Sequence, residues 1–509
     1  MNKKLFQLLS GALFLLVFFL PEVGISVEHE RFPVNDNLQR VFSEIPGGEV
    51  ARIRLMNKND ESWYARWTLI ESAKESIDTT YFILQNDIFG FSFLGLLKKK
   101  AEQGVKIRLM VDAKMIRQYF RLVGIDEFQD LAENANVQIR FYNSIPKSII
   151  DFVKNGDLRY IFSSNHDKIL LVDGRYVITG GRNIGADYFV QPGEEKIVYY
   201  DSDVLLEGEI LGREFRTAFE DEWKMLGNRI IRADKINISD QNIKLEIARR
   251  AMQCYMEGRK YSSENENGKE IPEKHKKLII KFNEELEEFK NISSLKNFQL
   301  WRGERARATK LLDKHSINGQ KDQIGYNLFQ FIRSARHEIV LQNPYVVLTK
   351  EAWEELKKAS ARGVKIVLHT NGPKSIDVPE ALAFFSKEWA EMMREMPTLK
   401  IFMAPDNLHQ LHSKTIVIDG QIALVGTYNL DPLSMIINSE LMIVVNNPEF
   451  SSMMRLRILN MTESSVECKI RREHDGSITR ILGPENFSTD AELRKMNLLV
   501  KLSWLRPLI

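Results

Sequence analysis

The chain repeats one pattern of residues in its two halves, and this repeat constrains the fold more than any other feature. Residues 71–112 and 333–371 share a Ser-Ala helix end, a β-rich apolar run, an amphipathic helix with a double or triple lysine, and Gly-Val-Lys-Ile opening another strand. This β-α-β order, present twice, predicts a mixed or parallel sheet flanked by helices in each half. We therefore expect an α/β chain of two lobes, which 509 residues are enough to build.

A shorter motif follows the repeat in each half. Residues 166–183 read HDKILLVDGRYVITGGRN, and residues 412–429 read HSKTIVIDGQIALVGTYN. The two align without a gap as His-x-Lys, four residues, Asp-Gly, and then a Gly followed three residues later by Asn. The apolar runs on both sides of Asp-Gly predict a β-hairpin with a type I′ turn in each half.

The paired His-x-Lys residues predict phosphodiester chemistry. Side chains alternate along a strand, so His166 and Lys168 point the same way, as do His412 and Lys414. One unprotonated imidazole can attack phosphorus, the other can act as the acid, and the lysines can stabilise the developing negative charge. We expect no cofactor and no metal, because the ammonium groups repel a cation and only His409 adds to the set.

Four other motif residues have a structural alternative. Asp173 and Asp419 fall at the predicted turns, and turn chemistry accounts for them without catalysis. Asn183 and Asn429 follow the return strands in glycine-flanked loops, where an amide can donate to a phosphate oxygen. Loop capping is the other interpretation of both asparagines.

Composition and local patterns suggest the boundaries. Residues 1–26 resemble a signal peptide, or an uncleaved N-terminal anchor, so we expect an exported protein. We expect a first lobe over 27–230, a charged helical insertion over 231–304, a second lobe over 305–450, and a C-terminal tail over 451–509 that docks on the body. The insertion is either a solvated linker or a partner-docking helix. Cys254 and Cys468 are either separate thiols or one disulfide.

In its motifs the chain resembles the phospholipase D superfamily, whose double His-Lys-Asp motif is matched in both halves between about residues 50 and 450. It is most similar to the bacterial cardiolipin synthases, through GGRNIGADYF, YYDSDVLLEG and GTYNLDPLSMIINSELMIVV. The resemblance implies two pseudo-symmetric lobes with one active site at their interface. It also implies that His166 is the nucleophile, forming a phosphohistidine, and that His412 is the general acid.

The same resemblance implies acidic residues that orient the histidines. Glu440 matches this role in the second half, and Asp201 is the candidate in the first half, with Asp203 close behind. Gly181 departs from the family pattern, where many members have Ser or Thr, as Thr427 does in the second motif. We expect this departure to cost a possible hydroxyl contact and little else.

These observations favour phosphatidyl transfer that makes cardiolipin. Phospholipase D hydrolysis, which releases phosphatidic acid, would use the same catalytic residues. The charge balance, with Lys+Arg 71 against Asp+Glu 69, argues against a secreted nuclease and a nucleic-acid partner. A non-catalytic binding module would be expected to have one degraded motif, and neither is degraded. We expect a phospholipid substrate and a membrane surface as partners, a monomer because one chain holds both motifs, and a periplasmic, outer-face or secreted location.

Overall fold

The computed structural model describes residues 32–115, 126–225, 228–231, 242–262, 272–406, 410–501 and 503–508. The predicted export segment 1–26 and His409 lie outside these residues. Within the described ranges, no helix is both long enough and apolar enough to cross a bilayer. Residues Val34–Ile509 form one compact unit.

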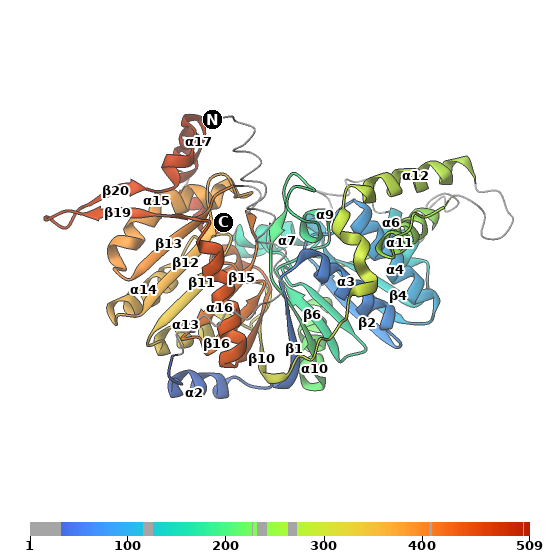
Figure 1. Ribbon diagram of the computed structural model, residues 1–509, viewed down its shortest axis with the longest axis horizontal. Coiled ribbons are helices and arrows are strands. Elements are labelled where there is room, and N and C mark those ends of the chain that lie inside the picture. The colour runs from blue at the N-terminus through green and yellow to red at the C-terminus, as the bar shows by residue number, and fades with distance from the viewer. Residues whose placement is uncertain are drawn as a thin grey trace, which may run out of the picture. The chain divides into compact units, whose positions relative to one another are not determined.

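One continuous sheet of sixteen strands runs through this unit, counted over the residues that the structure describes. The first lobe contributes half of it, on the right of Figure 1. In order across the sheet, these strands are β1 (Glu49–Met56), β8 (Asp203–Glu207), β6 (Tyr176–Gly180), β5 (Ile169–Val172), β2 (Ser76–Tyr81), β3 (Lys106–Asp112), β4 (Val137–Tyr142) and β9 (Arg229–Ile231).

The second lobe repeats this order strand for strand. Its strands are β10 (Ala306–Lys314), β17 (Glu440–Asn446), β16 (Ile422–Gly426), β15 (Lys414–Ile418), β11 (Glu338–Gln342), β12 (Lys365–Asn371), β13 (Leu399–Ala404) and β18 (Val466–Glu467). In each lobe the three strands of the β-α-β region are parallel and the others antiparallel. The mixed sheet predicted for each lobe is therefore confirmed, and the two form halves of one continuous sheet. The lobes join where β1 pairs antiparallel with β10.

Helices cover both faces of the sheet. One face of the first lobe carries α3 (Asn59–Ser72), α4 (Ile88–Glu102), α6 (Asp126–Ala132), α11 (Asn242–Met256), α12 (Glu273–Glu287) and η2 (Lys290–Asn297). The second lobe carries α2 (Asp36–Glu44), α13 (Ile324–Ser334), α14 (Lys350–Ala361) and α15 (Pro379–Glu395). On the other face, α10 (Glu209–Trp223) and α16 (Pro448–Thr462) cover a third apolar cluster that spans both lobes.

The remaining elements lie in the connections. Around the motifs are α7 (Ile145–Asn155), α8 (Arg159–Phe162), α9 (Ala186–Phe189), β7 (Tyr199–Tyr200), β14 (Gln410–Leu411) and the π-helix η4 (Leu433–Ile437). The C-terminal region contains β19 (Lys469–Arg472), β20 (Ile478–Leu482), η5 (Pro484–Phe487), α17 (Asp490–Lys501) and η6 (Ser503–Leu508).

Local sequence explains the repeated β-α-β units. Asp87 caps α4 by accepting from the Gly90 amide at 2.8 Å, and Thr349 caps α14 at the matching place in the second lobe. Both preceding helices end at the Ser-Ala dipeptide seen in the sequence, at Ser72 and Ser334. Each capped helix then connects two parallel strands, as a crossover helix does.

Three predicted boundaries differ from the structure. Helix α2, expected in the first lobe, packs on the second through Leu38, Val41 and Phe42. Within the insertion predicted over 231–304, the described helices α11 and α12 bury an apolar face in the core of the first lobe, so these helices are part of it and not a solvated linker. The second lobe extends past residue 450, because α16 covers its sheet and β18 pairs with β13.

Cys254 and Cys468 are not joined by a disulfide. Cys254 lies half-buried on α11 in the first lobe, and Cys468 is buried in the core of the second. The interpretation as separate thiols therefore applies.

Candidate active site

Each His-x-Lys motif leads into a hairpin that turns at Asp-Gly. The hairpins are β5–β6 and β15–β16. Asp173 and Gly174 have φ of 51° and 64°, and Asp419 and Gly420 have φ of 49° and 58°. A type I′ turn requires positive φ at both central residues, which Asp and Gly tolerate best. The turns therefore have the backbone conformation that the sequence predicts.

The two turn aspartates bind the backbone at the start of the neighbouring strand. Asp173 accepts from the amides of Lys74, Glu75 and Ser76 at 2.8–3.2 Å. Asp419 accepts from the three matching amides at 2.8–2.9 Å: Arg336, His337 and Glu338. It also accepts from Asn35 Nδ2 at 2.8 Å. Their contacts hold the hairpin to strands β2 and β11, which supports the structural interpretation.

The two motif histidines are each paired with a carboxylate from the opposite lobe. His166 Nδ1 lies 2.9 Å from both carboxylate oxygens of Glu440. His412 Nδ1 lies 2.6 Å from Asp201 Oδ2. With Nδ1 donating to a carboxylate, Nε2 of each ring is left to act on a substrate. The structure thus brings both predicted acidic residues to the histidines, in crossed pairs.

The backbone crosses between the lobes at the same points. The His412 amide donates to the Tyr200 carbonyl at 2.8 Å, next to the parallel pair β7–β14. The His166 amide donates to the Ser439 carbonyl at 3.2 Å, and the Ser439 amide donates back to the Ser164 carbonyl at 3.1 Å. Each histidine is therefore fixed by the segment that carries its carboxylate partner.

The two carboxylates have different surroundings. Glu440 accepts from Ser434 Oγ at 2.5 Å and from Thr427 Oγ1. Asp201, one methylene shorter, lies over Gly181, where a Cβ would be only 2.1 Å from Asp201 Oδ1. From the sequence we expected Gly181 to cost only a hydroxyl contact. The structure shows a larger role, because the absence of a side chain at Gly181 leaves the space that the shorter carboxylate of Asp201 occupies.

Asp203, the second candidate in the first half, serves a different role. Its carboxylate accepts from Ser62 Oγ at 2.5 Å and Arg66 at 2.9 Å, and pairs with Arg182 at 3.2 Å. These contacts neutralise two buried arginines in the core of the first lobe. Asp203 is thus structural, and Asp201 is the residue that reaches a histidine.

Burial and neighbouring charges shift the pKa values of the two histidine–carboxylate pairs differently. Burial, followed by the charges of Lys168 and Lys414, lowers the pKa of His166 well below its ordinary value. Burial raises the pKa of Glu440 to about 7. Although burial alone would raise it, the charges of His412 and Lys414 hold the pKa of Asp201 below its ordinary value. His412 is therefore the imidazole that faces the more fully ionised carboxylate.

The motif lysines lie beside the histidines. Lys168 Nζ donates to the His166 carbonyl at 2.8 Å, and Lys414 Nζ lies 2.9 Å from His412 Nδ1. Burial lowers the pKa of Lys168 to about 7 and that of Lys414 to about 8. A bound anion would favour the charged form of both amines, so they suit a phosphate ligand.

The two motif asparagines differ. Asn183 Oδ1 accepts from the Ile83 amide, and its Nδ2 donates to the Tyr188 hydroxyl, both at 3.0 Å. These contacts correspond to loop capping. Asn429 is buried, and its Oδ1 has no hydrogen-bond partner among the described residues. A role in binding phosphate stays a prediction for both.

Several site residues were missed from sequence. Ser434 and Thr427 hold Glu440, and Arg457 on α16 donates to Ser202 Oγ and to the Asp201 carbonyl. Aromatic rings also pack on the histidines, with centroids 4.8–5.4 Å away: Phe82 on His166, and Tyr188 and Tyr199 on His412. Only the alignment of Thr427 with Gly181 gave a signal for any of these contacts.

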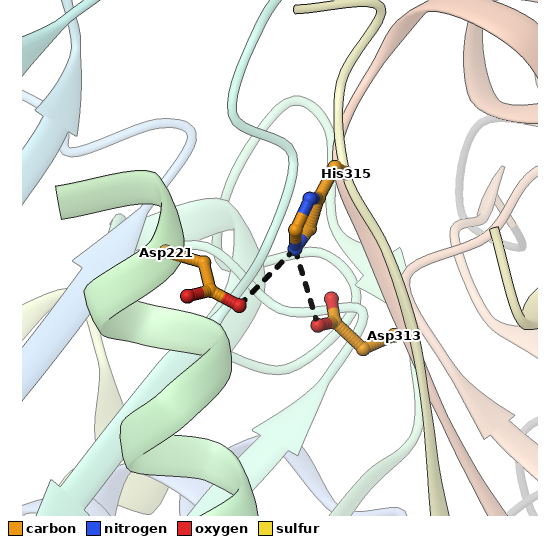
Figure 2. A group of neighbouring side chains, drawn as sticks. All are labelled: Asp221, Asp313 and His315. Carbon is orange, nitrogen blue, oxygen red and sulfur yellow. Dashed lines mark ion pairs between the residues drawn. The ribbon is translucent and has the colours of Figure 1, made fainter. Parts of the chain in front are cut away.

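A separate titratable group lies where α10 meets the end of β10 (Figure 2). His315 Nε2 is 3.3 Å from Asp221 Oδ2 and 3.7 Å from Asp313 Oδ2. Such a set could ligate a metal ion. However, Lys321 Nζ already donates to Asp313 Oδ2 at 2.7 Å and supplies a cation there. We interpret the group as ion pairs that join α10 of the first lobe to the second lobe.

Comparison with known proteins identifies relatives along most of the chain. A family model described as cardiolipin synthase, PLD-like domain, matches residues 67–223 and 328–461. Cardiolipin synthase C of Escherichia coli K12 is 24% identical over 433 residues, covering 79% of this chain and 83% of that protein. An uncharacterised protein of Helicobacter pylori 26695 is 22% identical over 480 residues, covering 88% and 87%.

A solved structure has the same fold. The crystal structure of phosphatidylserine synthase from Haemophilus influenzae Rd KW20 matches with a TM-score of 0.61 and 13% sequence identity. The match covers 93% of this chain and 100% of that one. The likeness therefore includes both lobes and the junction between them.

Proposed function

The chain belongs to the family of cardiolipin synthases with PLD-like domains, and from this membership we propose that it transfers a phosphatidyl group between lipid alcohols, making cardiolipin. The observation that carries the proposal is the pair of crossed histidine–carboxylate contacts, His166 with Glu440 and His412 with Asp201. They give two imidazoles, each with Nε2 available, at one place between two lobes.

The reaction proceeds in two balanced steps. First, Nε2 of His166 bonds to phosphorus, the bond from phosphorus to the headgroup oxygen breaks, and His412 gives that oxygen its proton. Next, a second lipid alcohol gives its proton to His412 while its oxygen bonds to phosphorus and the phosphorus–nitrogen bond breaks. Lys168, Lys414 and the two motif asparagines stabilise charge on the non-bridging oxygens.

The assignment of roles rests on the electrostatics of the two pairs. The nucleophile must be neutral, and the lowered pKa of His166 keeps it so. The acid must carry a proton: burial and the charge of Lys414 lower the pKa of His412, but the ionised Asp201 acts against this lowering and favours the imidazolium form. This difference supports His166 as the nucleophile and His412 as the general acid.

The test is to incubate the purified protein with phosphatidylglycerol and separate the products by thin-layer chromatography. Cardiolipin and free glycerol are expected. Phosphatidic acid as the main product would show that the enzyme hydrolyses the lipid and does not transfer the phosphatidyl group. Cleavage of DNA without action on lipid would overturn the proposal. His166→Ala and His412→Ala should each abolish product formation, and full activity in either variant would refute the two-histidine mechanism.

A substrate with an activated leaving group separates the two roles. Nitrophenolate leaves without help from an acid, so His412→Ala should still release one equivalent from a nitrophenyl phosphodiester and retain an acid-labile phosphoryl group. His166→Ala should release none. The reverse result would exchange the two roles.

We also propose that the enzyme is a monomer that works at the outer face of the cytoplasmic membrane. The support is the signal-like pattern of residues 1–26 and the presence of both motifs in one chain. N-terminal sequencing of the protein from cell fractions tests the location, and sedimentation equilibrium tests the oligomeric state.

A further inference from the structure

The two lobes differ in one connection beside the active site. In the first lobe, 23 residues separate the end of β4 at Tyr142 from His166, whereas seven separate the end of β13 at Ala404 from His412. The longer connection contains α7 and α8. Because the second lobe completes the same strand order with the short connection, the repeated fold does not need these helices.

The apolar stripe of helix α7 faces solvent, whereas that of a core helix faces the protein interior. Pro146, Ile149, Ile150 and Val153 recur at the i, i+3, i+4, i+7 spacing, which normally faces the protein interior. Here this face is exposed: Ile149 is 50%, Ile150 53% and Val153 73% accessible. The polar Ser148 is buried instead. The helix therefore presents an apolar surface outward.

Other exposed apolar side chains lie on the neighbouring elements, since α7 contacts α8 and α8 contacts η4. Leu158 and Phe162 lie on or beside α8, and Ile436 lies on η4, which contacts α8. We call the set the apolar patch: Ile149, Ile150, Val153, Leu158, Phe162 and Ile436. Phe162 is only four residues before His166. The Ser164 amide between them donates to Asn438 Oδ1 at 3.1 Å, which ties this stretch to the loop before Glu440.

We propose that the apolar patch docks on a lipid surface and so holds the active site against the membrane that supplies its substrate. The proposal deepens the proposed function and rests on it. A surface of this kind, at the rim of a site and carried on an additional element, is typical of an interfacial contact. Phospholipids lie in a bilayer, so a docking surface next to His166 shortens the path from lipid to catalyst.

Charge on the same element fits an anionic bilayer. Lys147 pairs with Asp151, and Arg159 pairs with Asp157. The remaining charged residue between 145 and 162 is Lys154, which is exposed on α7 next to Val153. The element thus has a small net positive charge beside its apolar stripe, which favours contact with headgroups such as phosphatidylglycerol.

The test compares a patch variant with a matched control in the full-length chain. The patch variant is Ile149→Ser, Ile150→Ser, Val153→Ser. The control is Val50→Ser, Ile280→Ser, Leu498→Ser, whose side chains are as exposed but lie on β1, α12 and α17. Because all six side chains are exposed, neither variant should change the melting temperature.

Two substrates separate docking from chemistry. On vesicles of phosphatidylglycerol and phosphatidylcholine, the patch variant should lose about tenfold or more activity, because less apolar surface enters the interface. On a soluble nitrophenyl phosphodiester it should match wild type. The control variant should match wild type on both. Equal vesicle activity in all three proteins would overturn the proposal, as would a loss shared by patch and control.

A direct probe distinguishes the other outcomes. An environment-sensitive dye on Val153→Cys, in a Cys254→Ser background, should shift to the blue and be quenched by bromolipid, and a dye on Ile280→Cys should do neither. A patch that covers itself by dimerisation would instead give a concentration-dependent shift without vesicles, and would overturn the proposal. If the dye reports insertion but no lipid product forms, docking stands and the proposed function fails.

Discussion

Replacing Gly181 by Thr should disable the Asp201–His412 pair. A Cβ at residue 181 would lie 2.1 Å from Asp201 Oδ1 and 2.5 Å from Oδ2, too close for either to stay. Asp201 cannot yield easily, because its Oδ1 accepts from the Ser202 amide at 2.7 Å while Oδ2 holds His412 at 2.6 Å. The carboxylate must therefore swing away from the imidazole.

The magnitude follows from the bond that is lost. A hydrogen bond to a charged group contributes about 1.5–3 kcal/mol. If it supports the imidazolium form of His412, its loss should lower kcat by about 10- to 150-fold. The second lobe suggests a rescue, because Thr427 coexists there with the longer Glu440. Combining Gly181→Thr with Asp201→Glu should recover most of the loss.

The assay is a double-mutant cycle on phosphatidylglycerol turnover with wild type, both single variants and the double variant. Gly325→Ala is the matched control, since a Cβ there meets no atom closer than 3.4 Å, and it should leave kcat unchanged. Melting temperatures establish that each variant is folded. A Gly181→Thr enzyme with wild-type kcat, or a double variant as impaired as that single variant, would refute the reasoning.

Three other predictions follow from the contacts described. Asp419→Ala should lower the free energy of unfolding by about 3 kcal/mol, measured by urea denaturation, because it leaves three backbone amides without their acceptor. Burial raises the pKa of Glu222 from 4.5 to about 7, so its stabilising contribution is complete below pH 4.5 and is lost as the pH rises through 7. Between pH 5 and 8, wild type should therefore lose up to about 3 kcal/mol more stability than Glu222→Gln. Arg457→Met should lower kcat several-fold and shift its pH profile while the melting temperature changes little, since Arg457 holds the 201–202 segment.

Sequence predicted the parts of the site that depend on local chemistry. Asp-Gly between apolar runs determines a turn with positive φ, so the turn conformation at Asp173 and Asp419 follows from neighbours in the chain. Their hydrogen bonds to the backbone at the start of β2 and β11 do not. The repeat likewise predicted the β-α-β unit of each lobe, because each copy must bury the same apolar face. Family resemblance added Glu440 and Asp201, which local patterns alone would leave as ordinary carboxylates.

Sequence could not supply what depends on the contact between lobes. That Glu440 reaches His166 and Asp201 reaches His412, and not the reverse, is set by segments more than 200 residues apart. Helix α2 is a similar case, since its sequence does not show which lobe it packs on, and its place on the second lobe depends on long-range contacts such as Asn35 with Asp419. The helices after residue 231 were misinterpreted because the segment that contains them is rich in charged residues. Each helix nevertheless has an apolar stripe, which includes Leu245 on α11 and Phe282 on α12.

The pairing of β1 with β10 has a consequence for any attempt to divide the chain. Each of these strands would be an unprotected sheet edge in an isolated lobe, with free amides and carbonyls that can recruit another chain. A single lobe cut from this protein should therefore associate with a partner, and the partner that restores the native edge also returns the missing carboxylate to its histidine. Mixing separately expressed halves should therefore restore catalytic activity, because pairing of β1 with β10 is the step by which the two halves recognise each other.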